Sequence, residues 1–451
     1  MNKIHINLYN LRIKKLFFFL FLMPFFLHAQ QVYNLKNCIE TGLEKNYEIR
    51  ILRNIQEINE HNATIGNAGY LPVIDLNSGY SGMWNHINQQ IPFGNGGVIS
   101  SNNSLNQTFN AGIYLNWTVF DGLKIQTTYQ RFKELQAIGE LNTHLTIENF
   151  IADISAEYYN YIQQLIQLKN LRYALKLSKE RLRIVEERYN IGSMSNLELQ
   201  QAKVDFNADS SKVIKQKEIL FASKVRLNQL MGIGEVDNDV FLADTTIIIN
   251  AEVFSKEQLW NKVLSHNTFL LLSEKDIQLG KLDLKSLKSA NYPYLRLNAG
   301  YGYVQNYYTT GTYSQQRNLG LSYGATLGFT LFDGMNRSRQ QKNAKIEIEN
   351  KKLTYDNIVL QLKSDFANMW MAYHNNISLW HLEKENLITA EKNYEIAMER
   401  YLLGNLSGIE LREAQNSLFE AEQRLVQAEY SIKICEISLF QISGQIGAIL
   451  F

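Results

Sequence analysis

The chain contains the same sequence pattern twice, and this repeat limits the folds it can adopt. The segment ERYNIGSMSNLELQQA begins at Glu187 and returns as ERYLLGNLSGIELREA at Glu399, a spacing of 212 residues. Further upstream the spacing is 221, because Pro72 corresponds to Pro293. A repeat of this length predicts that both halves hold the same elements and that the function uses both copies. We therefore expect one interlocked body rather than separate domains.

The first residues have the pattern of a secretory signal peptide, predicted over residues 1–29. A basic region precedes the apolar run Leu16 to Leu27, and Ala29 marks the cleavage site. This run is too short to span a bilayer as a helix, and no cysteine directly follows the predicted cleavage site to carry a lipid anchor. Without residues 1–29 the formal charge of +1 becomes about −3, which argues against nucleic acid as a partner.

The two cysteines, Cys38 and Cys435, lie toward the ends of predicted helices. An exported protein can pair its cysteines, but a single bridge is not a disulfide framework. We expect two buried thiols, with a disulfide as the alternative.

Long stretches without proline allow very long helices in both halves. The segment 123–190 predicts one helix, because apolar residues recur every seven positions at Tyr161, Leu168, Leu175, Leu182 and Tyr189. The counterparts in the second half are Tyr373, Trp380, Leu387, Tyr394 and Tyr401. A helix of this length extends about 100 Å, so it must run along partner helices.

The remaining segments complete the two repeats. The first repeat, 30–250, is predicted to hold a short helix (Leu35 to Asn67), a β-hairpin (72–120), the long helix (123–190), a return helix (196–232) and a belt segment (233–250). The second repeat, 251–451, holds a short helix (Ser255 to Ser289), a β-hairpin (293–332), a long helix (335–402) and a return helix (408–444). Asp121 and Asp333, in the repeated sequence Phe-Asp-Gly, are expected to be the N-caps of the long helices.

The two hairpins alternate cleanly between apolar and polar residues. In 319–331, for example, Leu319, Leu321 and Tyr323 share one face, and Gly320 and Ser322 share the other. The expected length of about 10–13 residues, with aromatic residues near the ends, is typical of strands that cross an outer membrane. The polar segments His86 to Thr108 and Tyr307 to Arg317 are expected to be loops on the outside.

Four strands cannot span a membrane alone, because an open sheet leaves unpaired backbone groups in hydrocarbon. Two chains would give eight strands with a filled interior, and three would give twelve with room for a water-filled bore. The small, polar inner face favours three. The predicted fold is an α+β membrane protein, in which a long α-helical coiled-coil barrel continues a transmembrane β-barrel shared by three chains, four strands per chain.

The order of these elements resembles the TolC family of outer-membrane efflux proteins. The resemblance covers nearly all of the chain after residue 29 and includes the Phe-Asp-Gly junctions and the turns of pattern YxxGxxSxxEL. It implies a homotrimer in outer-membrane lipid, with a helical tunnel in the periplasm of a diderm bacterium. It also implies a periplasmic adaptor as partner, an inner-membrane transporter reached through that adaptor, and a place for Val236 to Val253 in a belt around the tunnel.

The resemblance also assigns roles to residues near the two turns. It places the adaptor contacts at Gly192, Ser195, Leu197, Leu199, Gly404, Ser407, Ile409 and Leu411, and a periplasmic gate at Glu410, Glu413, Glu198 and Tyr401. Two rings of three carboxylates from Glu410 and Glu413 would favour cations. Leu406 departs from the family, since some members have a basic residue there. The structural alternative is that these residues simply shape two turns and a solvated helix face.

No sequence motif indicates an enzyme, a cofactor or a metal site. The histidines are scattered, with His374 and His381 seven residues apart on a predicted helix, and HExxH, GxSxG and CxxC are missing. The expected function is an outer-membrane channel for efflux or type I secretion. The alternative is a periplasmic coiled-coil adaptor or scaffold protein without a channel.

Overall fold

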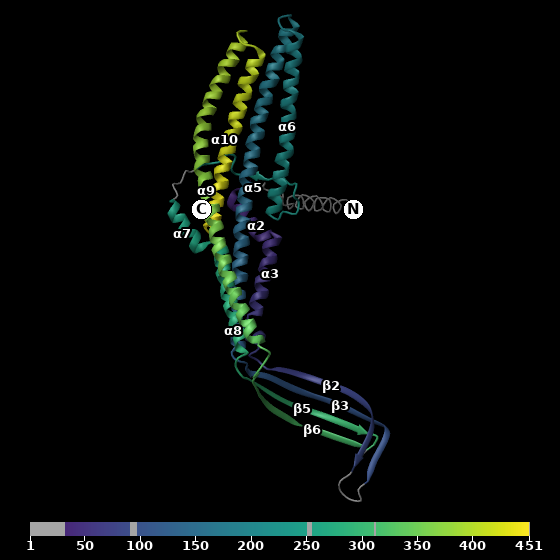
Figure 1. The fold of residues 1–451 in the computed structure, drawn as a ribbon. Coiled ribbons are helices and arrows are strands. Elements are labelled where there is room, and N and C mark those ends of the chain that lie inside the picture. Colours follow the sequence, from purple (N-terminus) through teal and green to yellow (C-terminus); the bar gives the residue numbers. More distant parts are fainter. Residues whose placement is uncertain (1–31, 91–96, 250–254, 311–312, 451) are drawn as a thin grey trace, which may run out of the picture.

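The computed structural model describes residues 32–90, 97–249, 255–310 and 313–450. The molecule is elongated, with helices running lengthwise and a β-sheet that bends away from one end (Figure 1). The two turns singled out by the repeat lie at the opposite end (Figure 1). The predicted signal peptide falls outside the described residues.

The two long helices are α5 (Lys124–Asn190) and α9 (Asn336–Leu402), as the sequence predicts. The N-cap prediction was wrong in position, because Leu123 and Met335 occupy the caps with φ of 73° and 65°. The aspartates still bond the first turns: Ile125 N donates to Asp121 Oδ1 (3.1 Å) and Arg337 N to Asp333 Oδ2 (2.9 Å). Each aspartate lies two residues before the N-cap, and its carboxylate accepts a hydrogen bond from a backbone N–H group that the helix itself leaves unpaired.

The return helices are α6 (Asn196–Leu230) and α10 (Gly408–Ile442). Each forms a helical hairpin with the long helix before it, α6 with α5 and α10 with α9 (Figure 1). Along α5, the residues of the seven-residue pattern are buried at Tyr161 and Leu168, whereas Tyr189 near the turn is 39% exposed.

The short first helices are each broken once or more, which corrects the prediction of single helices over Leu35 to Asn67 and Ser255 to Ser289. The first half has α2 (Leu35–Lys45), α3 (Tyr47–Asn62) and α4 (Ile65–Ala68); the second has α7 (Lys256–His266) and α8 (Thr268–Ser289). The breaks fall at Asn46 and at its repeat counterpart, Asn267.

One asparagine in each half joins three helix ends. The side chain of Asn46 caps α3 by accepting from Glu48 N (2.9 Å), and its Nδ2 donates to Leu230 O at the end of α6 (3.3 Å). Asn267 likewise accepts from Phe269 N (3.1 Å) and donates to Ile442 O at the end of α10 (2.9 Å). Free groups at helix ends are thus satisfied where a short helix stacks on a return helix.

The sheet contains β2 (Val73–Gln90), β3 (Val98–Phe120), β5 (Tyr294–Tyr308) and β6 (Gln315–Gly328), in the antiparallel order β2-β3-β5-β6. The strands have 14 to 23 residues and are longer than predicted. Much of the predicted loop from His86 to Thr108 pairs as strand, with a bulge at Asn85/Ile87. Its polar residues have low strand propensity, but the antiparallel ladder satisfies their backbone groups.

The pairing register aligns the apolar residues of both repeats on one face. Leu76 pairs with Ile113, Ile113 with Tyr301 and Tyr301 with Leu321, so one apolar row crosses the sheet. These side chains are 55% to 78% exposed in the single chain. The opposite face is formed by small and polar residues, among them Gly112, Gly302 and Gly320 in a neighbouring row.

The belt segment packs on the middle of the helices. Its strand β4 (Phe241–Leu242) pairs in parallel with β1 (Val32–Tyr33), and Tyr158 of α5 donates from its hydroxyl to Asp244 Oδ2 (2.6 Å). The core there includes Cys38, which is buried and unpaired, as is Cys435 in the neighbouring core cluster. The prediction of two buried thiols is confirmed. A short 3₁₀ helix, η1 (Ile446–Leu450), ends the described chain. Of the helices described, none combines the length and apolar character that a membrane span requires.

Candidate functional site

The candidate site is the pair of turns at the far end of the helices, which share one backbone geometry. Gly192 and Gly404 have φ of 78° and 81°, a conformation that residues with a Cβ rarely adopt. Each turn closes with a bond to the helix before it: Ser193 N donates to Arg188 O (2.8 Å), and Asn405 N donates to Arg400 O (2.9 Å). The two helical hairpins therefore end in equivalent, tightly fixed loops.

A capping box begins each return helix. Glu198 N donates to Ser195 Oγ (3.2 Å), and Ser195 N donates to Glu198 Oε2 (2.9 Å). The second turn repeats both bonds: Glu410 N donates to Ser407 Oγ (3.2 Å), and Ser407 N donates to Glu410 Oε2 (2.9 Å). The backbone bond from serine, with the bond from its hydroxyl, lowers the pKa of both Glu198 and Glu410. These two carboxylates therefore cap helices, as the structural alternative expects.

The apolar residues of the turns divide into an exposed and a buried set. Leu197 and Ile409 are 78% and 77% exposed, whereas Leu199 and Leu411 are buried among the helices. Leu199 and Leu411 therefore do not offer a contact surface, which corrects their assignment as adaptor contacts. The sequence analysis missed two other exposed residues, Ile191 and Leu403, which are also repeat counterparts. Their spacing of 212 was a signal that could have found them.

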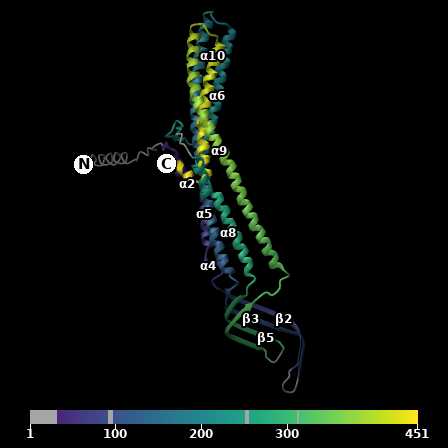
Figure 2. The ribbon, with the colours of Figure 1, turned by 60° about the vertical axis from the view of Figure 1, so that its left-hand side comes forward.

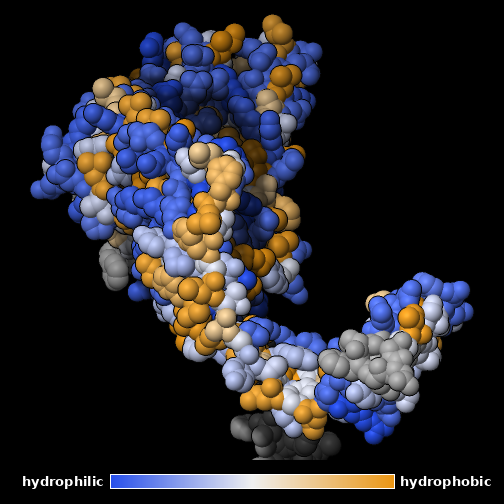
Figure 3. All heavy atoms as spheres, turned by 60° about the horizontal axis from the view of Figure 1, so that its bottom comes forward, coloured by the Kyte–Doolittle hydropathy of each residue, from blue (hydrophilic) through white to orange (hydrophobic). Residues whose placement is uncertain are grey.

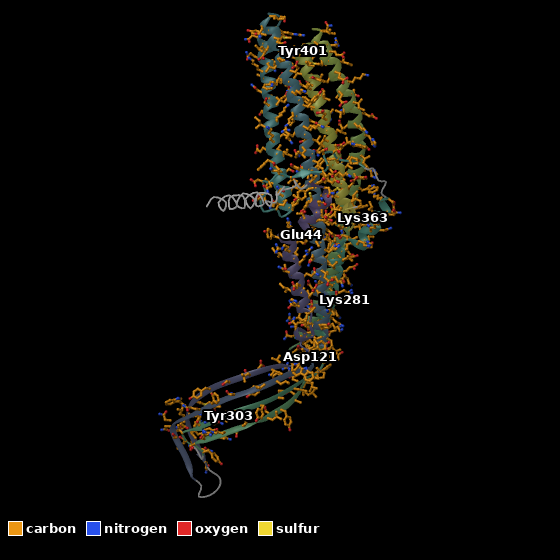
Figure 4. All side chains as sticks on the ribbon, turned by 180° about the vertical axis from the view of Figure 1, so that it is seen from behind. Glu44, Asp121, Lys281, Tyr303, Lys363 and Tyr401 are labelled. Carbon is orange, nitrogen blue, oxygen red and sulfur yellow. The ribbon has the colours of Figure 1, made fainter. Side chains whose placement is uncertain are left out.

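Tyr401 is held between the two hairpins near the end of α9 (Figure 4). It is 1% exposed, and the guanidinium of Arg188 from α5 lies 5.3 Å from its ring centroid. Arg188 Nη2 also donates to Leu402 O (3.0 Å) at the end of α9. Burial raises the pKa of the Tyr401 hydroxyl, although Arg188 opposes this. Leu406 packs half-buried against the core cluster that contains Tyr401 and Leu411.

Glu413 is exposed on α10 one turn after Glu410. Among the predicted gate residues, the structure thus places Glu198 and Glu410 in caps, Tyr401 in a buried contact and Glu413 on the surface. Whether these residues line an entrance depends on how several chains assemble, so this role stays a prediction.

A buried ionic cluster farther from the turns was not predicted. Arg412 of α10 donates to both oxygens of Asp209 on α6 (2.6 and 2.8 Å), and Ser178 of α5 also donates to Asp209. Asp209 is 2% exposed, and burial alone would raise its pKa, but Arg412 and Ser178 hold that pKa below its usual value. We call these three residues the clamp, because they fasten the second helical hairpin to the first.

The clamp borders a cavity of about 450 Å³ between α5, α6 and α10. Lys212, Lys215 and Glu420 also line it, so its wall carries both charge signs. No group of three potential metal ligands occurs within the described residues. His374 and His381 instead pack against Trp370 and Trp380, with ring centroids 4.7 and 4.8 Å apart.

The chain matches the family described as "Outer membrane efflux protein" over residues 39–233 and 259–445. It is 18% identical over 354 residues to the outer membrane protein TolC of Escherichia coli, covering 75% of this chain and 69% of that protein. It is 20% identical over 358 residues to the probable outer membrane lipoprotein SilC of Salmonella typhimurium, covering 78% and 75%.

Solved structures share the fold. The CmeC outer membrane channel of Campylobacter jejuni has a TM-score of 0.76 at 17% identity, covering 91% of this chain and 86% of that one. The outer-membrane channel OprN has a TM-score of 0.74 at 16% identity, covering 91% and 90%. These relatives are channel and efflux proteins, which supports the expectation that this chain is not an enzyme.

Proposed function

Because the chain belongs to the outer membrane efflux protein family, we propose that it forms the outer-membrane channel-tunnel of a tripartite efflux or type I secretion system. The protein resides in the outer membrane, as its relatives do. In this proposal it conducts substrates passively from the periplasm, where an inner-membrane pump delivers them, to the exterior.

The observation that carries the proposal is the sheet. One of its faces is a continuous exposed apolar surface, and the other is small and polar. Within the described residues β2 and β6 each pair on one side only, so both edges of the sheet are open. Unpaired backbone groups cost several kcal/mol each in hydrocarbon, which favours closure with copies of the same chain. Three chains would give a barrel of twelve strands with a polar lumen.

The helices support a tunnel below such a barrel. Helices α5 and α9 each have 67 residues, or about 100 Å, and each begins a few residues after a strand ends. Helices this long can carry the lumen from the membrane to the turns at the far end (Figure 1).

The turns are the proposed docking surface for a periplasmic adaptor, which in turn binds the inner-membrane transporter. Four apolar side chains at least 75% exposed flank the turns, at the ends of the long helices and the starts of the return helices: Ile191, Leu197, Leu403 and Ile409. Exposed apolar anchors on a preformed surface are typical of protein interfaces. The repeat presents the pattern twice per chain, so a trimer would offer six similar sites. The buried Leu199 and Leu411 support the loops from behind.

Glu413 and Glu410 are the proposed carboxylate rings at the entrance, and the capping box allows a sharp test. Gln preserves a capping box while removing the charge, so Glu410→Gln with Glu413→Gln changes the charge without fraying α10. Glu44→Gln, on α2 far from the turns (Figure 4), is the matched control.

The measurement is oligomeric mass in mild detergent together with single-channel conductance in planar bilayers. We expect a trimer with a small, cation-selective conductance. The double Gln variant should conduct more and lose part of its selectivity, and the Glu44 control should not. A soluble monomer or dimer without conductance would overturn the channel and favour the periplasmic scaffold.

A further inference from the structure

The sheet holds few charged side chains. Among the strand residues that the structure describes, the acidic and basic ones are Asp75, His86, Arg296 and Arg317. Arg317 lies on the apolar side of the sheet, two residues before Leu319. Asp75 and Arg296 lie on the small, polar face, and in Figure 3 much of the visible surface of the sheet is pale or hydrophilic. In the proposed barrel the polar face lines the lumen, so these two side chains are charged groups of its wall.

Arg296 lies at the end of the sheet that adjoins the helices. It is close to the start of β5, which follows α8 after a short turn, and it pairs with Thr118 near the end of β3. Figure 2 shows the sheet meeting the lower ends of the helices. In the proposed channel a solute that leaves the helical tunnel crosses the level of Arg296 as it enters the barrel.

An aromatic ring holds the guanidinium of Arg296 in place. The Cζ atom of Arg296 lies 4.6 Å from the ring centroid of Tyr294, two residues earlier on the same face of β5. The Tyr294 ring in turn lies over Gly328 of β6, its partner in the ladder, where an added Cβ would collide with the ring. Glycine, tyrosine and arginine thus form a stack across β5 and β6, which we call the arginine stack.

The charge of Arg296 is not neutralised by a neighbouring carboxylate. Arg296 is exposed, and no other described residue forms an ion pair with it. Arg337, near the start of α9, differs in that its Nε lies 3.1 Å from Asp333 Oδ2. The ladder partners of Asp75 and Arg296 on β3 are four residues apart, about 13 Å along the strand. This separation exceeds the Debye length of about 8 Å at physiological ionic strength, so Asp75 does not cancel the field of Arg296.

We propose that Arg296 determines charge selectivity at the base of the barrel, where the arginine stacks of three chains form a ring that attracts anionic substrates. The inference rests on the trimeric channel of the proposed function. Rings of Arg or Lys favour anions in pores, and a guanidinium binds carboxylate and phosphate groups through two parallel hydrogen bonds. The substrates that this ring favours are therefore solutes with a carboxylate or phosphate group, whereas the proposed entrance at Glu410 and Glu413 favours cations.

Reversal potentials in planar bilayers test the ring in the full-length protein. The parent is the Glu410→Gln, Glu413→Gln variant in a KCl gradient, so that the entrance carboxylates do not mask the barrel. Arg296→Gln should lower the ratio of chloride to potassium permeability roughly twofold at about 0.1 M salt, and Arg296→Lys, which keeps the charge, should retain the parent ratio. Arg317→Gln removes the same charge from the opposite side of the sheet, so it is the matched control and should leave the ratio unchanged.

The salt dependence separates charge from a change in the shape of the bore. The effect of Arg296→Gln should grow at 0.01 M salt and vanish at 1 M, because the Debye length falls from about 30 Å to about 3 Å. A shift that is independent of salt, or an equal shift in Arg317→Gln, overturns the ring. A conducting parent whose permeability ratio Arg296→Gln leaves unchanged also overturns the ring and leaves the proposed channel intact. A parent without conductance overturns the channel itself, and the ring with it.

Discussion

At the scale of one residue, the carboxyl group of Glu422 on α10 is partly buried, and no described cation or hydrogen-bond donor offsets its charge. Its Oε2 is buried without a hydrogen bond to any described residue, and Glu391 lies close enough to add like charge. Burial first, and Glu391 second, raise the pKa of Glu422 to about 7 from 4.5. Between these two values the folded protein binds the proton more tightly than the unfolded chain, so this group lowers stability as the pH rises.

Replacing Glu422 by Gln should therefore stabilise the protein at pH 8 and leave its stability near pH 4.5 unchanged. A gain of about 1 kcal/mol is expected, since the carboxyl is only partly buried. The check is the thermal unfolding midpoint of the purified protein at several pH values. Glu420→Gln, whose carboxylate is 70% exposed on the same helix, is the control. An equal gain at both pH values would show that charge is not the cause.

At the scale of elements, the clamp is the strongest polar link between the two helical hairpins. Arg412→Ala would remove the cation that binds both oxygens of buried Asp209 and leave only Lys212, 3.5 Å from Oδ1, at a cost of about 3 kcal/mol. Removing both partners should recover much of this loss. Arg424→Ala, which breaks the half-exposed pair with Glu383, should cost less than about 1 kcal/mol. The four proteins can be compared by thermal unfolding, and equal losses for Arg412 and Arg424 would contradict the clamp.

The elements also show what the sequence could and could not predict. The long helix predicted from Leu123 begins at Lys124, because the seven-residue pattern and the lack of proline determine it locally. The break at Asn46 was missed, since the side chain that caps α3 there also bonds Leu230 O at the end of α6, 184 residues away. The strand lengths were underestimated because polar residues such as Ser101 and Ser104 extend β3 through ladder bonds rather than through propensity.

The candidate site likewise has a part that the sequence could predict and a part that it could not. The turns and their serine caps were predictable, because Gly and Ser have local conformational reasons to be there. The burial of Leu199 and the clamp depend on packing between helices. The repeat did contain a signal for the clamp, since the counterparts of Arg412 and Asp209 are Gln200 and Ala421. A charged pair that occurs in only one of the two repeats indicates a contact that its repeat counterpart does not form.

At the scale of the whole molecule, the apolar face of the sheet should tolerate no charge. Leu321→Lys places an ammonium in the apolar row and should cost about 2–4 kcal/mol of stability in the membrane. Ser322→Lys, the next residue on the polar face, should be tolerated. Denaturant unfolding of both variants from lipid vesicles measures the difference. If both variants were equally stable, the face would not be in contact with lipid.

The clamp has a mechanical consequence for a ring built from three such chains. Such a ring would have six contacts between helical hairpins, alternately within a chain and between two chains. The Arg412–Asp209 ion pair would strengthen only the contacts within a chain. At the contacts between chains the equivalent residues are Gln200 and Ala421, which cannot form an ion pair. The two hairpins of each subunit would then swing as one lever. The entrance would therefore widen with threefold symmetry, because the helical hairpins would separate first at the three interfaces between subunits.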